Sequence, residues 1–124
     1  IGTAFATGNN SHLMKGRDIR SGTPKEITIK EQDSADALAP ILSQILGGIK
    51  DALENTPPEL SADLVDMGLT LTGGAALLTN IDKLIAKETG LPVQIADDPL
   101  ACVAIGTAKA LENEELFSTM LSEY

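Results

Sequence analysis

Hydrophobic and polar positions in the first thirty residues predict a pair of strands. The segments SHLMKGRD and KEITIK flank Ser21-Gly22-Thr23-Pro24, a turn-rich gap that is typical of a hairpin loop. Two strands alone are only marginally stable in water. We therefore expect this hairpin to pack against the segment that follows it.

A long amphipathic helix is predicted next. Its apolar residues recur at spacings of three and four, which places them on one stripe of a helix. They are Leu38, Ile41, Leu42, Ile45, Ile49, Ala52 and Leu53. Pro40 removes one backbone donor, and Gly47 and Gly48 each cost roughly 1 kcal/mol relative to alanine. We expect a kink near Pro40 and close packing at the two glycines.

The second half of the chain alternates helices with short strands. The segment Thr56-Pro57-Pro58-Glu59 has the form of a capping box, with Thr56 as the cap and proline in the first helical position. A short helix is predicted from there to a C-cap at Gly68. Leu69 to Thr72 then predicts a strand.

A repeat of this pattern completes the chain. Apolar residues at Ile81, Leu84 and Ile85 mark a helix that ends at Gly90, and PVQIA predicts a second strand. Asp98-Pro99 has the cap-then-proline start of a further helix, which runs through about Glu112. The order helix, strand, helix, strand, helix predicts an α/β fold whose two strands are parallel and covered by helices.

Composition narrows the classes of function. The 124 residues carry a formal net charge of −9, and the densest basic cluster is only Lys15, Arg17 and Arg20. Nucleic-acid binding depends on clustered Lys and Arg, so we expect no nucleic-acid partner. No apolar run has the length of a membrane span, so we expect no direct membrane segment. The chain begins at Ile1 rather than at a methionine, which favours a piece of a longer protein.

The isolated reactive side chains favour structural roles. Cys102 is the single cysteine, and its small apolar neighbours predict a buried, inert thiol in a reducing cytoplasm. Asp97 and Asp98 have no third ligand nearby in sequence, so helix capping by Asp98 is favoured over a metal site. His12 is expected to be solvated. We therefore predict no catalytic residue and no metal ligand.

The stretch LTLTGGAALL, residues 69 to 78, is the strongest candidate for a binding site. Two glycines directly after a strand allow close backbone approach to a ligand, and an immediate helix start would direct its amides at a phosphate or ribose. Taken alone, the pattern more often marks a plain turn. It matches neither the G-x-G-x-x-G fingerprint nor a G-K-[ST] phosphate loop.

A family resemblance adds weight to the ligand hypothesis. The segment from PPELSADLVDMG through TLTGGAALL to DDPLACVAIGTAKALE resembles the C-terminal end of MreB, the family of bacterial actin homologues that governs rod shape. The specific elements are the PPEL-x-x-D box, the TGG turn, the ETGLPV connector and the DPL-x-CVA-x-G-T helix. The likeness is dense from Pro57 to Glu112 and extends upstream through SGTPKEITI and ALAPILSQI.

This resemblance implies an actin-like ATPase of two α/β domains, each with a ribonuclease-H-like core and a small inserted subdomain. Residues 1–54 would be the later part of the small subdomain of domain II, with the hairpin and long helix. Residues 55–112 would be the closing half of its core, with parallel strands and helices. Residues 113–124 form an acidic tail that is predicted to be an amphipathic helix.

Nucleotide-binding residues also follow from the resemblance. Gly73, Gly74 and Ala75 match the family's adenosine-binding turn, and Leu77 and Leu78 would begin the helix beside the adenine. Family members commonly have a third glycine where this chain has Ala75. We expect the ligand to approach the backbone of Gly74, and a positive φ there that favours glycine.

The resemblance assigns the hydrolytic machinery to a region upstream of these residues. It implies ATP and Mg²⁺ in a full-length parent, and no tightly bound cofactor or ATP hydrolysis in this chain alone. It also implies that the small face of Ala101, Ala104, Gly106 and Ala108 packs beside the interdomain hinge, slightly favoured over simple core filling.

The implied parent is a cytoskeletal protein of the cytoplasm. It would polymerise with ATP into filaments at the inner face of the cytoplasmic membrane and organise wall synthesis. Its partners would be further copies of itself and cell-shape and wall-synthesis proteins such as RodZ. Rival hypotheses are another ATPase of the superfamily, such as a sugar kinase or an Hsp70-type protein, and an interaction module without nucleotide. The pairing of ETGLPV with DPL-x-CVA favours the MreB family over those relatives.

Overall fold

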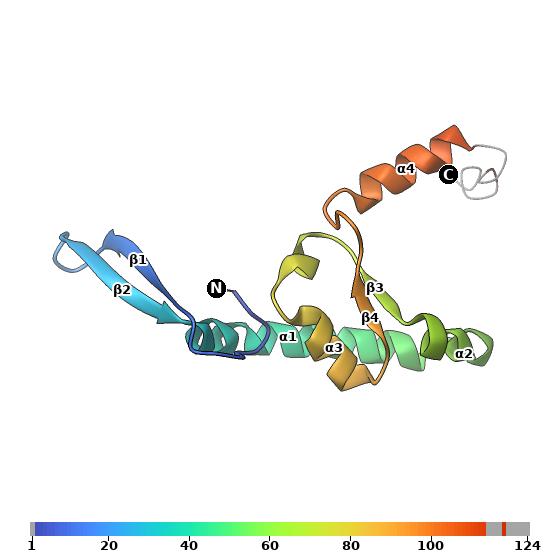
Figure 1. Cartoon of the computed structure of the whole chain (residues 1–124), viewed down its shortest axis with the longest axis horizontal. Coiled ribbons are helices and arrows are strands. Elements are labelled where there is room, and N and C mark those ends of the chain that lie inside the picture. The colour runs from blue at the N-terminus through green and yellow to red at the C-terminus, as the bar shows by residue number, and fades with distance from the viewer. Residues whose placement is uncertain (1, 114–117, 119–124) are drawn as a thin grey trace.

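The computed structural model describes residues 2–113 and 118 of the chain. Its elements are β1 (Ser11–Arg17), β2 (Pro24–Lys30), α1 (Glu31–Glu54), α2 (Pro58–Met67), β3 (Leu69–Leu71), the 3₁₀ helix η1 (Gly74–Leu77), α3 (Ile81–Thr89), β4 (Val93–Ile95) and α4 (Cys102–Glu112). Figure 1 shows an elongated molecule in which α1 runs along the long axis. The β1–β2 hairpin extends from one end of α1, and α4 stands apart from the other elements.

The predicted hairpin is confirmed. Strands β1 and β2 pair antiparallel, with Lys15 opposite Glu26. Asp18 organises the turn because its Oδ1 accepts hydrogen bonds from the backbone N–H groups of Arg20 at 2.8 Å and Ser21 at 3.2 Å. These bonds, helped by Lys25, lower the pKa of the Asp18 carboxyl below its usual value.

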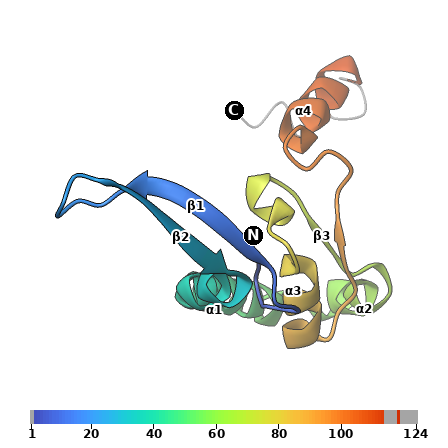
Figure 2. The ribbon, with the colours of Figure 1, turned by 60° about the vertical axis from the view of Figure 1, so that its left-hand side comes forward.

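The expected packing of the hairpin against the next segment is wrong. Every residue of β1 is exposed. Because β2 passes directly into α1 at Lys30 and Glu31, the hairpin continues away from the helix instead of folding back over it (Figures 1 and 2). Leu13, Met14 and Ile27 consequently remain about half exposed.

The predicted long helix is confirmed as α1, which continues through Pro40 and both glycines. Its start is stabilised by Asp33, whose Oδ2 accepts a hydrogen bond from the backbone N–H of Lys30 at 2.9 Å. The expected close packing at Gly47 and Gly48 is wrong, because a Cβ at either position would meet no heavy atom within 4 Å. The unfavourable residues are tolerated because tertiary packing of the apolar stripe stabilises the helix.

The predicted capping box before α2 is wrong. The Thr56 hydroxyl donates to the carbonyl of Ala52 at 2.8 Å, so it satisfies the end of α1. Helix α2 begins at Pro58. Its N-cap residue is Pro57, whose side chain makes no capping hydrogen bond. The C-cap at Gly68 is confirmed, with φ of 71°.

The two predicted parallel strands are confirmed, with Leu69 opposite Val93 and Leu71 opposite Ile95. Helix α3 connects them and ends at Gly90, which has the left-handed conformation of a C-cap. The order β3, α3, β4 is a compact βαβ unit. The α/β architecture predicted from the sequence is therefore present in the second half of the chain.

One small core joins this unit to α1. Its buried members are Ala4, Leu42, Ile81 and Ile85, with partly buried Phe5, Leu38, Leu46, Ile49, Leu69, Leu71, Leu78, Leu84 and Val93 around them. Three of the seven residues of the predicted apolar stripe contribute, namely Leu38, Leu42 and Ile49, whereas Ile41 is 54% and Ile45 is 39% exposed. The core therefore holds α1, α3 and the β3–β4 sheet in fixed relation, together with the first residues of the chain.

The last helix differs from its prediction. Helix α4 begins at Cys102, and its N-cap Ala101 makes no side-chain cap bond. Asp98 does not cap it. Asp98 has a positive φ of 45° and lies in a turn, in which its backbone carbonyl accepts a hydrogen bond from the N–H of Ala101 at 3.0 Å. Helix α4 has no buried residue, so the expected covering of the sheet by this helix is wrong. The predicted tail helix at 113–124 falls largely outside the described residues.

Gly68 generates the first testable prediction. Its φ of 71° and ψ of −156° lie in a region that is almost restricted to glycine, and an added Cβ would overlap the Pro92 carbonyl. Gly68→Ala should lower the free energy of unfolding by more than about 2 kcal/mol. The measurement is urea denaturation followed by circular dichroism.

Gly48→Ala is the matched control, since the added methyl would lie in open space on α1. It should raise stability by about 0.5–1 kcal/mol, because alanine has the higher helix propensity. Equal effects of the two substitutions would contradict the described close approach of Gly68 to Pro92.

Candidate functional site

The glycine turn after β3 is not the immediate helix start that the sequence predicted. Gly73 has φ of 79° and ψ of 174°, and its N–H donates to the Pro99 carbonyl at 2.7 Å. The short η1 follows, and α3 starts only after Asn80, which is left-handed. The expectation that Leu77 and Leu78 begin the helix is therefore wrong. Leu77 ends η1, and Leu78 is extended.

An open pocket of about 470 Å³ lies where η1 faces α1. Four of the five predicted binding residues line it, namely Gly74, Ala75, Leu77 and Leu78. The opposite side comes from Leu38, Ile41, Leu42 and Ile45 of α1, with Gly2 and Ile81 completing the lining. Gly73 is not in the lining, because it lies at the start of the turn and is bonded toward Pro99.

Apolar side chains dominate this pocket, and several are uncovered. Leu77 is 58% exposed and Ile41 is 54% exposed, although both are large hydrophobic residues. Ala75 is also exposed, so its methyl group adds to the surface. A site of this kind suits a flat, largely apolar group held by contact and by close backbone approach.

The two glycines of the turn have different roles. The expectation of a positive φ at Gly74 is wrong, because the positive φ belongs to Gly73. A Cβ at Gly74 would lie 3.3 Å from Cδ2 of Leu100, so the loop between β4 and α4 restricts that position. The turn is therefore shaped by its contact with this loop, through Pro99 and Leu100.

Two polar residues that sequence reasoning missed lie behind the turn. Asn80 is 8% exposed and Thr3 is 1% exposed, and Nδ2 of Asn80 donates to Oγ1 of Thr3 at 3.1 Å. The preference of asparagine for left-handed backbone is a weak local signal for Asn80. Nothing local indicates Thr3, because its partner is 77 positions away.

The remaining candidate residues offer little reactive chemistry. His12 is exposed, as predicted. Cys102 is half-buried rather than buried, and its thiol donates to the Asp98 carbonyl at 3.5 Å. Among residues 2–113 and 118, no group of three His, Cys, Asp or Glu side chains could hold a metal ion.

The small residues of α4 do not pack against a neighbour within the described part of the chain. Ala104, Gly106 and Ala108 are exposed, and Ala101 is half-buried. The alternative of core filling is therefore not observed, and packing beside a hinge stays a prediction. In the same described part, no helix combines the length and apolar character needed to cross a membrane.

Comparison with known proteins places this geometry in a family context. The family model described as MreB/Mbl protein matches residues 1–119. The cell shape-determining protein Mbl of Bacillus cereus is 46% identical over 114 residues, which are 91% of this chain and 34% of the relative. The cell shape-determining protein MreB of Escherichia coli K12 is 46% identical over 113 residues, which are 90% of this chain and 33% of the relative.

Solved structures give the same picture. The crystal structure of MreB5 of Spiroplasma citri bound to ADP matches this chain with a TM-score of 0.82 and 37% sequence identity. The match covers 100% of this chain and 37% of the MreB5 chain. The AMPPNP-bound form of MreB5 matches with a TM-score of 0.82 and 39% sequence identity, and this match covers 93% of this chain and 35% of the MreB5 chain. The fold class expected from the sequence is confirmed, and this chain spans about a third of the length of the curated relatives.

The unequal roles of the two glycines can be tested by alanine substitution. Gly73→Ala should lower the free energy of unfolding by about 1–3 kcal/mol, because its backbone conformation is almost restricted to glycine. Gly74→Ala should cost less, because its φ is ordinary and the exposed side chain of Leu100 can move aside. Urea denaturation of both variants measures the difference. A larger loss at Gly74 would contradict the described turn.

Proposed function

Because this chain belongs to the MreB/Mbl protein family, we propose that it is part of an actin-like ATPase that determines cell shape and that it carries the adenosine-binding turn. The observation that carries the proposal is the apolar pocket between η1 and α1, which brings Gly74, Ala75, Leu77 and Leu78 together. The family match disfavours the sugar-kinase and Hsp70 hypotheses. An interaction module without nucleotide remains the competing hypothesis for this pocket.

Adenine fits the chemistry of this pocket. Its ring faces are apolar, so Leu77 and the facing side of α1 would cover them, and the Gly74–Ala75 backbone would approach the ribose. Support comes from the similar protein MreB5 of Spiroplasma citri, whose crystal structures contain ADP or AMPPNP. The methyl group of Ala75 replaces the glycine common in the family and narrows the approach to the backbone.

Phosphate and magnesium chemistry is assigned to the remainder of the parent protein. The described residues contain no candidate metal cluster. In the proposed assignment, residues 1–54 belong to the small subdomain of domain II and residues 55–112 to its core. ATP with Mg²⁺ would bind between two domains in the parent, and this chain alone would not hydrolyse ATP.

Charge distribution supports self-association as the second part of the function. Residues 11–30 hold five of the nine Lys and Arg residues, Lys15, Arg17, Arg20, Lys25 and Lys30, against two acids, Asp18 and Glu26. That segment has a net charge of +3. The rest of the chain therefore has a net charge of −12, and the two together give the total of −9. At the α1–α2 end, five acidic residues are exposed: Asp51, Glu54, Glu59, Asp63 and Asp66.

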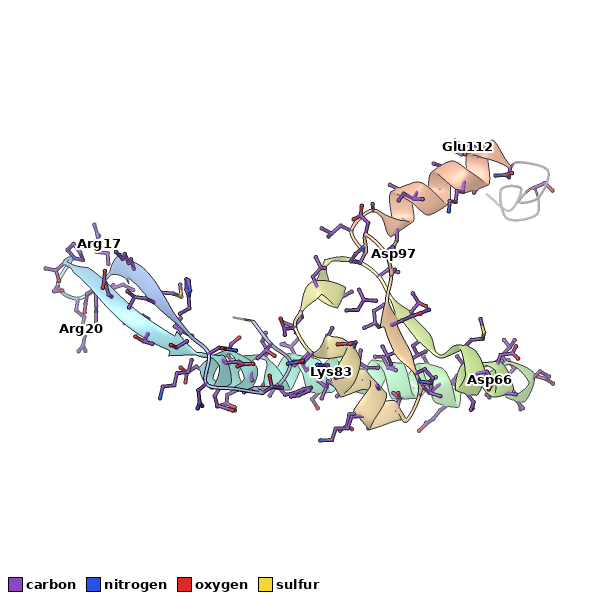
Figure 3. The ribbon with its side chains drawn as sticks, in the orientation of Figure 1. Arg17, Arg20, Asp66, Lys83, Asp97 and Glu112 are labelled. Atoms are coloured by element: carbon purple, nitrogen blue, oxygen red, sulfur yellow. The ribbon has the colours of Figure 1, made fainter. Side chains whose placement is uncertain are left out.

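The two charged regions lie at opposite ends of the molecule. Figure 3 shows Arg17 and Arg20 at the tip of the hairpin and Asp66 at the far end of the long axis. Opposite charges on two different surfaces favour a head-to-tail contact, which produces an open filament when its rotation does not close. We propose that copies of the parent stack in this way into cytoplasmic filaments.

These filaments would lie at the inner face of the cytoplasmic membrane and organise wall synthesis through cell-shape proteins such as RodZ. The names of the Bacillus cereus and Escherichia coli relatives, cell shape-determining proteins, support a role in cell shape. The proposed assembly would thus connect a nucleotide-binding domain to the geometry of the cell.

Leu77 provides the test of nucleotide binding in the full-length protein. Leu77→Asn removes apolar contact from the pocket, so ATP affinity should fall by about tenfold, equivalent to roughly 1.4 kcal/mol. The melting temperature should change little, because Leu77 is 58% exposed. Isothermal titration calorimetry on folded protein measures the affinity.

Leu111→Asn is the matched control, because Leu111 is 59% exposed on α4 and lies outside the pocket lining. It should leave ATP affinity unchanged. A wild-type protein that binds no adenine nucleotide would favour the interaction-module hypothesis, and equal affinities of the two variants would remove Leu77 from the site.

Charge reversal tests the head-to-tail contact. Arg17→Glu with Arg20→Glu should abolish assembly at low salt, because the hairpin would then repel the acidic α1–α2 end. Adding Asp63→Lys and Asp66→Lys to the same chain should restore it. Sedimentation of the full-length protein with ATP is the measurement. Lys83→Glu, a reversal on the exposed surface of α3, is the control and should assemble normally.

A further inference from the structure

The first described residues of the chain are fastened to the loop that precedes α3. Thr3 forms a parallel bridge with Thr79, and the N–H of Ala4 donates to the Thr79 carbonyl at 2.8 Å. Oγ1 of Thr3 donates to the carbonyl of Phe5 at 2.8 Å, and Nδ2 of Asn80 donates to the same carbonyl at 3.2 Å. With the Asn80–Thr3 bond, these contacts form a buried polar network that we call the Thr3–Asn80 clamp.

The clamp is constrained on both sides. Asn80 is held in a left-handed conformation with φ of 65°, which directs its amide toward the first residues. Thr3 is the most buried side chain of the described residues, at 1% exposed. A buried polar pair of this kind is favourable only while all partners remain in place, so it specifies one position for the segment.

That position matters because the segment is a wall between two cavities. Gly2 lines the apolar pocket, and it also lines a second, more polar cavity of about 330 Å³. The second cavity includes His12 and the buried carboxylate of Glu31. On the pocket side, a Cβ at Gly2 would lie 3.5 Å from Cδ1 of Leu78, so the segment touches the predicted binding turn.

We propose that Thr3 and Asn80 are positioning residues that hold this wall and thereby set the width of the adenine pocket. This inference rests on the proposed nucleotide site. Neither side chain lines the apolar pocket, so neither is expected to touch the base. Their effect passes through Gly2: when the clamp opens, the wall separates from Leu78 and the apolar pocket connects with the polar cavity.

Base selectivity is the property that depends on this wall. Guanine, with its carbonyl, ring N–H and 2-amino group, is more strongly hydrated than adenine, so contact with the apolar side chains of the pocket costs guanine more hydration free energy. Once water enters from the polar cavity, that penalty falls. Opening the clamp should therefore weaken ATP binding and also reduce the preference for ATP over GTP.

The test uses two substitutions in the full-length protein. Thr3→Val keeps the shape of the side chain and removes the hydroxyl, and Asn80→Gly keeps a residue that adopts positive φ and removes the amide. Each should reduce ATP affinity by about fivefold or more and narrow the ratio of ATP to GTP affinity, since small displacements of positioned groups have effects of this size. Calorimetric titration with each nucleotide gives both quantities.

Two further variants distinguish positioning from general stability. Thr3→Ser retains the hydroxyl and should restore wild-type affinity and selectivity. Ile85→Val shortens a core residue that is 2% exposed and outside the pocket lining, so it should lower the melting temperature without changing the ATP to GTP ratio.

The possible outcomes separate this inference from the proposed function. A wild-type protein that binds neither nucleotide contradicts the proposed function, and the inference falls with it. In a second outcome, the wild type prefers ATP, and the Thr3→Val and Asn80→Gly variants fold and keep the same affinity and selectivity. That outcome overturns the inference and leaves the proposed function in place. If neither variant folds, the clamp is a folding element and the inference is likewise overturned.

Discussion

The contact of Leu42 on α1 with Ile81 and Ile85 on α3 is the interaction on which the rest of this structure depends. These are the large buried residues of the core, and the β3–β4 sheet and the first residues pack around them. Full burial of one such side chain contributes about 1.5–3 kcal/mol, so a core of this size stabilises only what is directly attached to it. The hairpin and α4 lie beyond it and have largely exposed surfaces.

The same contact creates the candidate site. Because Leu42 packs against Ile81, the apolar stripe of α1 extends past the core and faces η1, where Ile41 and Leu77 remain uncovered. The pocket is thus the unfilled continuation of the core. Leu100 lies beside Gly74 on one side of it, and Gly2, which adjoins the Thr3–Asn80 clamp, lies beside Leu78 on the other.

Helices α2 and α4 also expose large apolar side chains, away from the pocket. Leu60, Val65 and Met67 on α2, and Val103 and Leu111 on α4, are all more than half exposed. Large uncovered apolar surfaces usually mark contacts with other protein. This chain spans about a third of the length of its curated relatives.

The sequence by itself determined the elements whose signals are local. The turn at Gly22 predicted the hairpin, the spacing of Leu42 and Ile49 predicted α1, and Gly68 and Gly90 marked helix ends, because backbone preference and periodicity act over a few residues. The family resemblance, which the comparisons confirmed, identified the TGG turn as the place to look for a ligand.

Only the tertiary structure decided how these elements meet. Thr56 bonds back to α1 instead of capping α2, and Asp98 enters a turn instead of capping α4. The strained glycine is Gly73, and Thr3 lies beside Asn80 although 77 positions separate them. The Thr56 and Asp98 bonds span only four and three residues, so they are local alternatives that compete with the predicted caps. The Thr3–Asn80 pair is instead selected by packing across the core, where the free energy of a contact depends on distance in space and not on distance along the chain.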